Sequence, residues 1–176
     1  MKQKQQQIEG MLYTHKIAML SKVLWKNAEI DWQAWLRKSD ITMNEHLILL
    51  TIYAFERATI SDISKYGVMH VSTAFNFAKR LEQQELLSLK KDTSDKRNTF
   101  IVLTEKGKQL VEEIFDQYDE SKNHIFNVSK QYKDEMFHLP NFSDAHYLVS
   151  KLQGKEFIDD VNLCQENLRK NLLDEQ

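Results

Sequence analysis

The scarcity of helix-breaking residues constrains the fold of this chain more than any other feature. Among its 176 residues there are one proline, Pro140, and four glycines. Because proline and glycine end or weaken helices, a chain with so few of them is expected to be mainly α-helical. A hydrophobic content of 41% is enough for a packed core, and the length fits one domain, either alone or with appendages.

The cysteine content and the apolar runs indicate the compartment. Cys164 is the one cysteine, which excludes an internal disulfide and favours a reducing, cytoplasmic setting. The start of the chain is basic and rich in glutamine, without the apolar stretch of a signal peptide. No run approaches 18 apolar residues, so we expect no membrane span.

The first part of the chain is expected to form one long helix, because apolar residues recur at helical spacing from residue 8 to residue 38. Three of them are tryptophans within eleven residues: Trp25, Trp32 and Trp35. Aromatic residues are enriched both in cores and at subunit interfaces. This helix is therefore predicted to pack either into the core or against a second chain.

A run of three helices is expected next. Thr42 followed by Glu45 matches a capping box, which satisfies free N–H groups at a helix start. Ser61 is the expected N-cap of the short second helix, and Gly67 lies where the chain is expected to turn sharply. The third helix follows in the stretch "GVMHVSTAFNFAKRLEQQELL", which begins at Gly67.

Two short β-like runs come after these helices. The runs "LLSLKK" and "NTFIVLT", separated by the polar "DTSDKR", predict a β-hairpin. Thr104 is expected to cap another helix, and residues 121–173 are expected to be helical with breaks near Pro140 and Gly154. Apolar residues of the last helix recur every three or four positions, which predicts an amphipathic stripe.

The third helix has two contrasting faces. On a helical wheel Ala74, Phe77, Ala78 and Leu81 form a core-facing stripe. The opposite side carries hydrogen-bonding and cationic groups that suit the major groove of DNA, although a plain solvated face is the alternative. The candidate DNA-contacting residues of this helix are His70, Ser72, Thr73, Phe75, Asn76, Lys79, Arg80 and Gln83.

The predicted hairpin adds positive charge beside that helix. Residues 65–97 hold seven Lys or Arg and four acids, a local charge of +3 within a chain whose net charge is −2. A basic hairpin tip can straddle the DNA backbone and insert arginine into a narrow minor groove. The candidate DNA-contacting residues of the hairpin are Lys90, Lys91, Asp95, Lys96 and Arg97.

The stretch "TISDISKYGVMHVSTAFNFAKRLEQQELLSLKKDTSDKRNTFIVLTEKG" resembles the winged helix-turn-helix core of the MarR family of transcriptional regulators. The resemblance implies a homodimer that binds double-stranded DNA at pseudo-palindromic, A/T-rich promoter sites. It also implies that Asp95 braces an arginine, Arg97, that enters the minor groove. The implied domains are an N-terminal dimerisation helix (1–41), a DNA-binding domain (42–106) and a C-terminal dimerisation region (107–176).

The family's dimers intertwine their terminal helices. The resemblance therefore implies an interface built from both ends of this chain, with these residues as candidates: Leu12, Met19, Trp25, Phe157, Val161, Cys164, Leu168 and Leu172. Many members also bind a small-molecule effector beside the dimerisation region. Tyr13, Trp25 and Trp32 either line such a pocket or fill a core, and the sequence does not choose between these.

A narrower resemblance is to the family's regulators of protease production, carried by "AMLSKVLWKNAEIDWQAWL", "GVMHVSTAFNFAKRLE" and "DKRNTFIVLTEKG". It implies repression of extracellular protease genes and, in a sporulating host, of sporulation genes. The chain departs from the family near Glu85, where many members have a glycine that ends the recognition helix. Glu85 must adopt a positive φ or the helix must end differently.

Other functions find less support. A winged-helix module that binds protein rather than DNA is the alternative, but it should expose an apolar patch where the outer face offers Phe75 alone. The six histidines lack metal-ligand spacing, so we predict no metal site and no cofactor. Cys164 has no cationic neighbours in sequence that would favour a reactive thiolate. Motifs of enzymes are absent from the sequence, so we predict no enzymatic activity.

Overall fold

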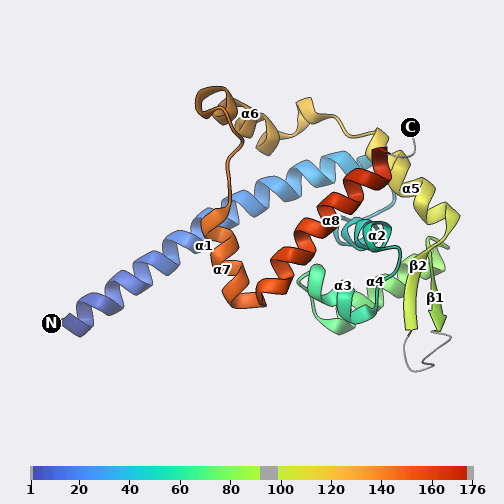
Figure 1. Ribbon diagram of the computed structural model, residues 1–176, viewed down its shortest axis with the longest axis horizontal. Coiled ribbons are helices and arrows are strands. Elements are labelled where there is room, and N and C mark those ends of the chain that lie inside the picture. Colours follow the sequence, from blue (N-terminus) through green and yellow to red (C-terminus); the bar gives the residue numbers. More distant parts are fainter. Residues whose placement is uncertain (1, 92–98, 174–176) are drawn as a thin grey trace. The chain divides into compact units, whose positions relative to one another are not determined.

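The computed structural model describes residues 2–91 and 99–173 of the chain (Figure 1). The chain divides into two compact units. The first consists of residues 1–37 and 119–140, and the second consists of residues 38–118 and 141–176. The first unit thus combines segments from both sides of the predicted DNA-binding region, and the second contains that region together with the C-terminal segment.

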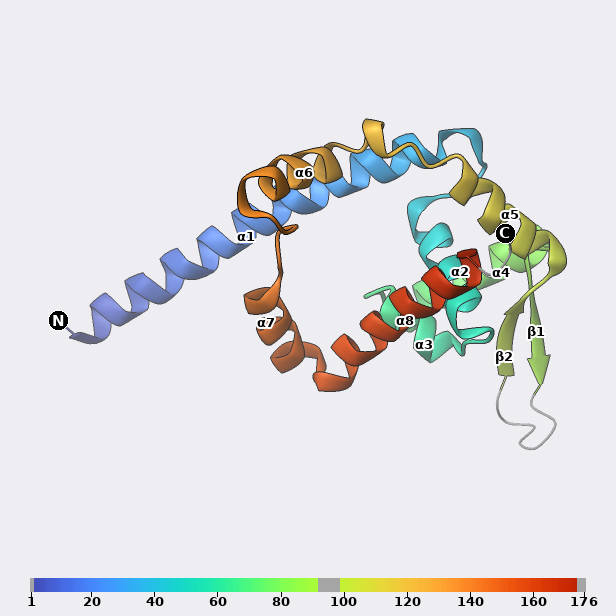
Figure 2. The same cartoon turned by 45° about the horizontal axis from the view of Figure 1, so that its top comes forward.

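The first unit is built on one long helix. Helix α1 (Lys2–Trp35) is followed by the 3-10 turn η1 (Leu36–Lys38), which confirms the predicted N-terminal helix with slightly different ends. The 3-10 turn η2 (Glu120–Lys122) and helix α6 (His124–Met136) come from the later segment. Helix α6 packs against α1 (Figure 2).

A buried carboxylate joins α6 to α1. Asp31, 6% exposed, accepts a hydrogen bond from the backbone N–H of Ile125 at 3.0 Å, and its other oxygen lies 2.6 Å from His124 Nδ1. Burial alone would raise the pKa of Asp31, but these hydrogen bonds outweigh burial and hold the pKa below its ordinary value. Asp31 therefore stays ionised and anchors the first turn of α6 to the end of α1.

The second unit is a winged helix-turn-helix. Its order is α2 (Met43–Phe55), α3 (Ile60–Tyr66), α4 (Val71–Gln83), β1 (Leu87–Lys91), β2 (Thr99–Leu103) and α5 (Glu105–Asp116). Helices α7 (Ser143–Gln153) and α8 (Lys155–Leu173) complete the unit. The predicted fold class, mainly helical with a β-hairpin wing, is confirmed, and so are the predicted breaks near Pro140 and Gly154.

One hydrophobic core holds this unit together. Its fully buried members come from α2, α3, α4, both strands and α5: Ile48, Leu49, Ile52, Ile63, Ala74, Ala78, Leu81, Leu87, Ile101 and Val111. Ala58 forms an isolated bridge with Ile101, with hydrogen bonds of 3.0 and 2.7 Å in the two directions. This bridge joins the segment before α3 to the base of the wing.

The helix starts follow capping chemistry, with one correction. The capping box of Thr42 and Glu45 is confirmed. The expected N-cap at Ser61 is wrong, because Thr59 occupies that position and forms a capping box with Asp62. Thr59 lies three residues before an acid, the spacing that a reciprocal cap requires, whereas Ser61 lies one residue before Asp62 and cannot bond to it in that way.

Helix α8 covers the helix-turn-helix within this unit (Figure 1). Leu168 and Leu172 pack against the core, and the side-chain amide of Asn171 donates to the carbonyl oxygen of Tyr53 at 3.0 Å. Near the other end of α8, Asp160 accepts hydrogen bonds from Lys65 and Tyr66 of α3. Two of the predicted dimer-interface leucines thus pack on the core of their own chain.

The other predicted interface residues of α8 are partly accessible. Phe157 lies 6.4 Å from the ring of Tyr66, between ring centroids, and Val161 is 38% exposed. Cys164 is half-buried, and burial raises the pKa of its thiol above the ordinary value. The roles of these residues and of Leu12, Met19 and Trp25 in a dimer stay predictions.

Candidate nucleic-acid interface

Helix α4 is attached to the core by one narrow face. Ala74, Ala78 and Leu81 are 1% exposed or less, and Phe77 packs partly buried beside them. Small residues at two of these positions let α4 approach α2 closely. The wheel analysis of the buried face is therefore confirmed.

The opposite face of α4 is open to solvent. The exposed candidates are Ser72, Thr73, Phe75, Asn76, Lys79, Arg80 and Gln83, together with His70 at the helix start. The face is less polar than the sequence predicted, because Val71 at 56% exposure joins Phe75 at 45%. Hydrogen-bonding, cationic and apolar groups are thus available along the same helix.

Lys79 has two neighbours on its own helix. Its ammonium group lies 2.7 Å from Oε2 of Glu82 and 5.9 Å from the ring centroid of Phe75. Both Lys79 and Glu82 are substantially exposed, so solvent screens this ion pair and it contributes little to stability. The ammonium group can therefore exchange Glu82 for another anion at low cost.

Arg80 is held by a buried carboxylate. Its Nε lies 3.1 Å from Oε1 of Glu45, whose side chain is completely buried while that of Arg80 is 49% exposed. The other carboxylate oxygen of Glu45 accepts hydrogen bonds from the backbone N–H and the hydroxyl of Thr42, at 2.9 and 2.7 Å. Glu45 therefore fixes the start of α2 and the orientation of the Arg80 guanidinium together.

The tight turn expected at Gly67, between α3 and α4, is confirmed, but the residue with the positive φ is the next one. Gly67 has an ordinary φ of −78°, and it is needed for space, because a Cβ there would lie 2.8 Å from the carbonyl oxygen of Ile63. The left-handed residue is Val68, with φ 48° and 72% exposure. His70 is the N-cap of α4 but makes no capping hydrogen bond through its side chain.

The end of α4 is tied to the wing and to α5. Glu85 adopts φ 62°, so the first of the two outcomes predicted for this position is confirmed. The N–H of Leu86 donates to the carbonyl of Leu81, and the N–H of Glu85 donates to that of Glu82, which is a Schellman ending. The hydroxyl of Thr104 then donates to the carbonyl oxygen of Glu85 at 2.7 Å.

Gly107 allows this junction to close. A Cβ at this position would collide with the carbonyl oxygen of Leu86. Its N–H donates to the hydroxyl of Thr104, which confirms the predicted cap of α5. The end of α4, the strand β1 and the start of α5 are thus locked together, and the wing keeps a fixed position relative to α4.

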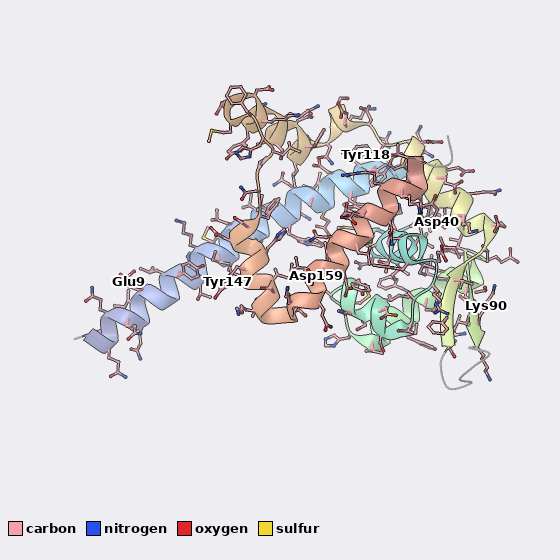
Figure 3. All side chains as sticks on the ribbon, in the orientation of Figure 1. Glu9, Asp40, Lys90, Tyr118, Tyr147 and Asp159 are labelled. Carbon is pink, nitrogen blue, oxygen red and sulfur yellow. The ribbon has the colours of Figure 1, made fainter. Side chains whose placement is uncertain are left out.

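The wing is a two-stranded antiparallel hairpin. Lys90 pairs with Phe100 and Lys91 with Thr99 at the distal end of the described strands. Both lysines are exposed, and Figure 3 shows Lys90 on the hairpin. Asp95, Lys96 and Arg97 lie outside the described residues, so their predicted contacts are untested.

Comparisons with known proteins decide the family. The MarR family model matches residues 41–99. The HTH-type transcriptional regulator Hpr of Geobacillus sp. (strain WCH70) is 41% identical over 167 residues, which cover 95% of this chain and 83% of the relative. Hpr of Shouchella clausii is 43% identical over 164 residues, which cover 93% and 84%. The chain belongs to the MarR family of transcriptional regulators.

The fold agrees with this assignment. The crystal structure of S. aureus MepR in its DNA-binding conformation matches with a TM-score of 0.57 and 26% identity, over 80% of this chain and 98% of that one. This chain is therefore a DNA-binding transcriptional regulator of the MarR family. The predicted winged helix-turn-helix fold and the predicted family, MarR, are thus both confirmed.

Two features beside the candidate interface were not predicted from the sequence: the ion pair of Glu45 with Arg80 and the exposed Val71. Glu45 was predicted as a cap, and its ion pair with Arg80 was not foreseen, because 35 positions separate the two in the chain. Val71 was missed because the wheel was centred on the polar residues. Val71 lies about 40° from Phe75 on that wheel, at the edge of the core-facing stripe, and was assigned to neither face.

The two alternatives for Tyr13, Trp25 and Trp32, lining of an effector pocket or filling of a core, stay predictions. A hollow of about 520 Å³ lies in the second unit, between Tyr53 and Glu56 of α2, Lys90 of the wing and Asn171 of α8. Tyr13, Trp25 and Trp32 do not line it. Within residues 2–91 and 99–173 there is no cluster of metal-ligating side chains and no helix able to cross a membrane.

Proposed function

We propose that this protein is a homodimeric repressor that binds pseudo-palindromic, A/T-rich promoter DNA and silences extracellular protease genes. In a sporulating host, sporulation genes are further targets. Helix α4 enters the major groove, and the wing contacts the backbone and the adjacent minor groove. The observation that carries the proposal is the open face of α4, where Asn76 and Gln83 offer adenine-pairing amides beside Lys79.

The N-terminal helix supports the dimer. Every residue from 3 to 27 is exposed, and Figure 3 shows side chains projecting around this part of α1, near Glu9. Most of its large exposed apolar residues fall on two stripes about 120° apart, and Met11 and Trp25 lie outside both. One stripe holds Ile8, Leu12, Met19, Val23 and Ile30, and the other holds Tyr13, Ile17, Leu20 and Leu24.

A helix that is apolar over so much of its circumference is stable in water only when other helices cover it. In the first unit α6 packs against α1, yet these residues remain 39–59% exposed. A second copy of the chain supplies the missing cover. Two recognition helices, held at a fixed spacing, then explain why the site should be a pseudo-palindrome.

The choice of target genes rests on the narrower resemblance to the family's regulators of protease production. The chain shares 41–43% identity with two regulators named Hpr over nearly its whole length. Their closeness supports a common class of target, the genes of secreted proteases. Deleting the gene in its host should raise secreted protease activity, and unchanged activity would contradict this part of the proposal.

The DNA-reading role of α4 is tested by substitution. Asn76→Ala should weaken binding to the preferred site by about 1–3 kcal/mol and relax sequence preference, because one base pair loses its bidentate partner. Lys79→Ala should weaken binding to all sequences and lower the salt dependence. Fluorescence anisotropy measures both, with exposed Gln109→Ala on α5 as control. Unchanged affinity in both variants would refute the assignment of α4.

A further inference from the structure

Two exposed apolar side chains on α4 are not explained if its outer face contacts DNA only through hydrogen bonds and charges. Val71 is 56% exposed and Phe75 is 45% exposed. They lie four positions apart and therefore on the same side of the helix, about 40° from each other. Together they form what we call the apolar ridge, Val71 and Phe75.

The apolar ridge borders the residues proposed to bind DNA. On the wheel it lies beside Ser72 and Lys79 and away from the arginine shoulder that Glu45 holds. Lys79 places its ammonium group 5.9 Å from the ring centroid of Phe75. The ridge therefore ends in a positive charge, so its surroundings favour an occupant that combines an apolar group with nearby anions.

The major groove of DNA offers that combination. Its base edges carry one apolar substituent, the C5 methyl group of thymine, and phosphates line its rims. Residues near the start of a recognition helix reach base edges first, and Val71 is the first residue of α4. Four helical residues span roughly 6 Å, which corresponds to about two base-pair steps.

We propose that the apolar ridge reads thymine methyl groups at two positions, about two steps apart, in each half-site. This inference rests on the proposed DNA-binding function and adds a source of specificity. Burial against a methyl group removes apolar surface of both partners from water, so it favours thymine over cytosine and over uracil. A protein surface docking on the ridge is the competing occupant.

The test replaces thymine with deoxyuridine, which deletes the methyl group and keeps the hydrogen-bonding edges. A preferred site is first selected from random-sequence DNA with the full-length protein. Each thymine of that duplex is then replaced singly by deoxyuridine, and the affinity is measured by fluorescence anisotropy. At two positions per half-site the wild-type affinity should fall by about fourfold, the factor expected for one methylene-sized group.

Val71→Ala and Phe75→Ala should each lose this discrimination at one of the two positions. Both side chains are substantially exposed, so the fold should tolerate their truncation. Val128→Ala, at a 64% exposed valine of α6, is the matched control and should discriminate as the wild type does. The inference is supported if each alanine variant loses the discrimination between thymine and deoxyuridine at a different one of the two positions.

Three results would overturn it, and they separate it from the function on which it rests. If the wild type binds its selected site and ignores every deoxyuridine, the ridge reads no methyl group while DNA binding stands. If both alanine variants discriminate fully, other residues make the contact. If the selection enriches no sequence, the proposed function fails as well, and a protein partner on the ridge becomes the better explanation.

Discussion

At the scale of single residues, Glu45 connects folding to the DNA-binding face. It is completely buried, it caps α2 through Thr42, and it holds Arg80 at 3.1 Å. A buried carboxylate that loses its cation is strongly destabilising, whereas a neutral side chain in its place is tolerated. Arg80 therefore has a structural role beside any contact with DNA.

The two roles of Arg80 can be separated. Arg80→Ala should lower the free energy of unfolding by about 2 kcal/mol, because Glu45 keeps its charge in a buried site. Adding Glu45→Gln to this variant should recover part of the loss. Urea denaturation measures the stability, and anisotropy measures DNA binding. If the double variant regains stability but not affinity, Arg80 also contacts DNA; if Arg80→Ala has wild-type stability, the buried ion pair is unimportant.

His46 predicts how stability depends on pH. It is completely buried, and burial lowers its pKa to about 4. In the unfolded chain the pKa is about 6.5, so between these values the unfolded state binds a proton that the folded state does not. Stability should therefore be fully present above pH 6.5 and fall as pH drops toward 4, by on the order of 2–3 kcal/mol.

Thermal unfolding between pH 7 and pH 5 measures this effect of His46. His46→Leu should flatten the curve in that range, while His146→Leu, at an exposed position of α7, should leave it unchanged. A wild-type protein whose stability does not change between pH 7 and pH 5 would contradict the burial of a neutral His46.

At the scale of elements, the end of α4 carries backbone strain. Glu85 has φ 62° in the Schellman ending, a conformation that costs a non-glycine residue about 1–2 kcal/mol. Its side chain is 84% exposed, and its 3.8 Å ion pair with Lys106 adds little. The Glu85 side chain therefore does little to offset this strain.

Glu85→Gly should raise the free energy of unfolding by about 1 kcal/mol, since glycine adopts a positive φ without strain. Gln83→Gly, two residues earlier and still helical, should lower it by a similar amount. Chemical denaturation compares the two variants. Equal destabilisation by both would show that Glu85 is not strained in solution.

The elements differ in how far the sequence predicts them. The α4 faces, the hairpin and the Thr42 and Thr104 caps followed from local periodicity and capping rules, and all were confirmed. The left-handed residue of the turn did not follow, because Gly67 is demanded by close approach and Val68 takes the positive φ. Close approaches between backbone atoms of different residues cannot be predicted from a local sequence pattern.

At the scale of the whole molecule, the oligomeric state is the main consequence of the exposed N-terminal helix. We predict a dimer of about 42 kDa, twice the 20.9 kDa chain, by multi-angle light scattering. Met19→Glu should shift the equilibrium toward monomer, because a charge replaces an apolar residue on the first α1 stripe. Gln7→Glu, at an exposed position away from both stripes, is a control for added negative charge. A wild-type monomer at micromolar concentration would contradict the dimer.

The family can be recognised from the order of motifs along the chain and not from any single motif. Individual motifs, such as a capped helix or a basic hairpin, are common in unrelated proteins. Their order along the chain, from Thr59 through the LTEKG segment that contains Gly107, carries the resemblance to the MarR family, and the relatives confirm the family. The packing of Leu168 and Leu172 on the chain's own core could not be inferred, since an amphipathic stripe does not reveal what covers it.

The central claim is sequence-specific DNA binding, and the most direct measurement is binding at several salt concentrations. Fluorescence anisotropy would compare an A/T-rich palindromic promoter fragment with a shuffled one. We predict a preference of about a hundredfold or more for the palindrome and an affinity that falls steeply with salt, as several phosphate contacts are lost. A well-folded protein that binds neither DNA at any salt concentration would contradict the account.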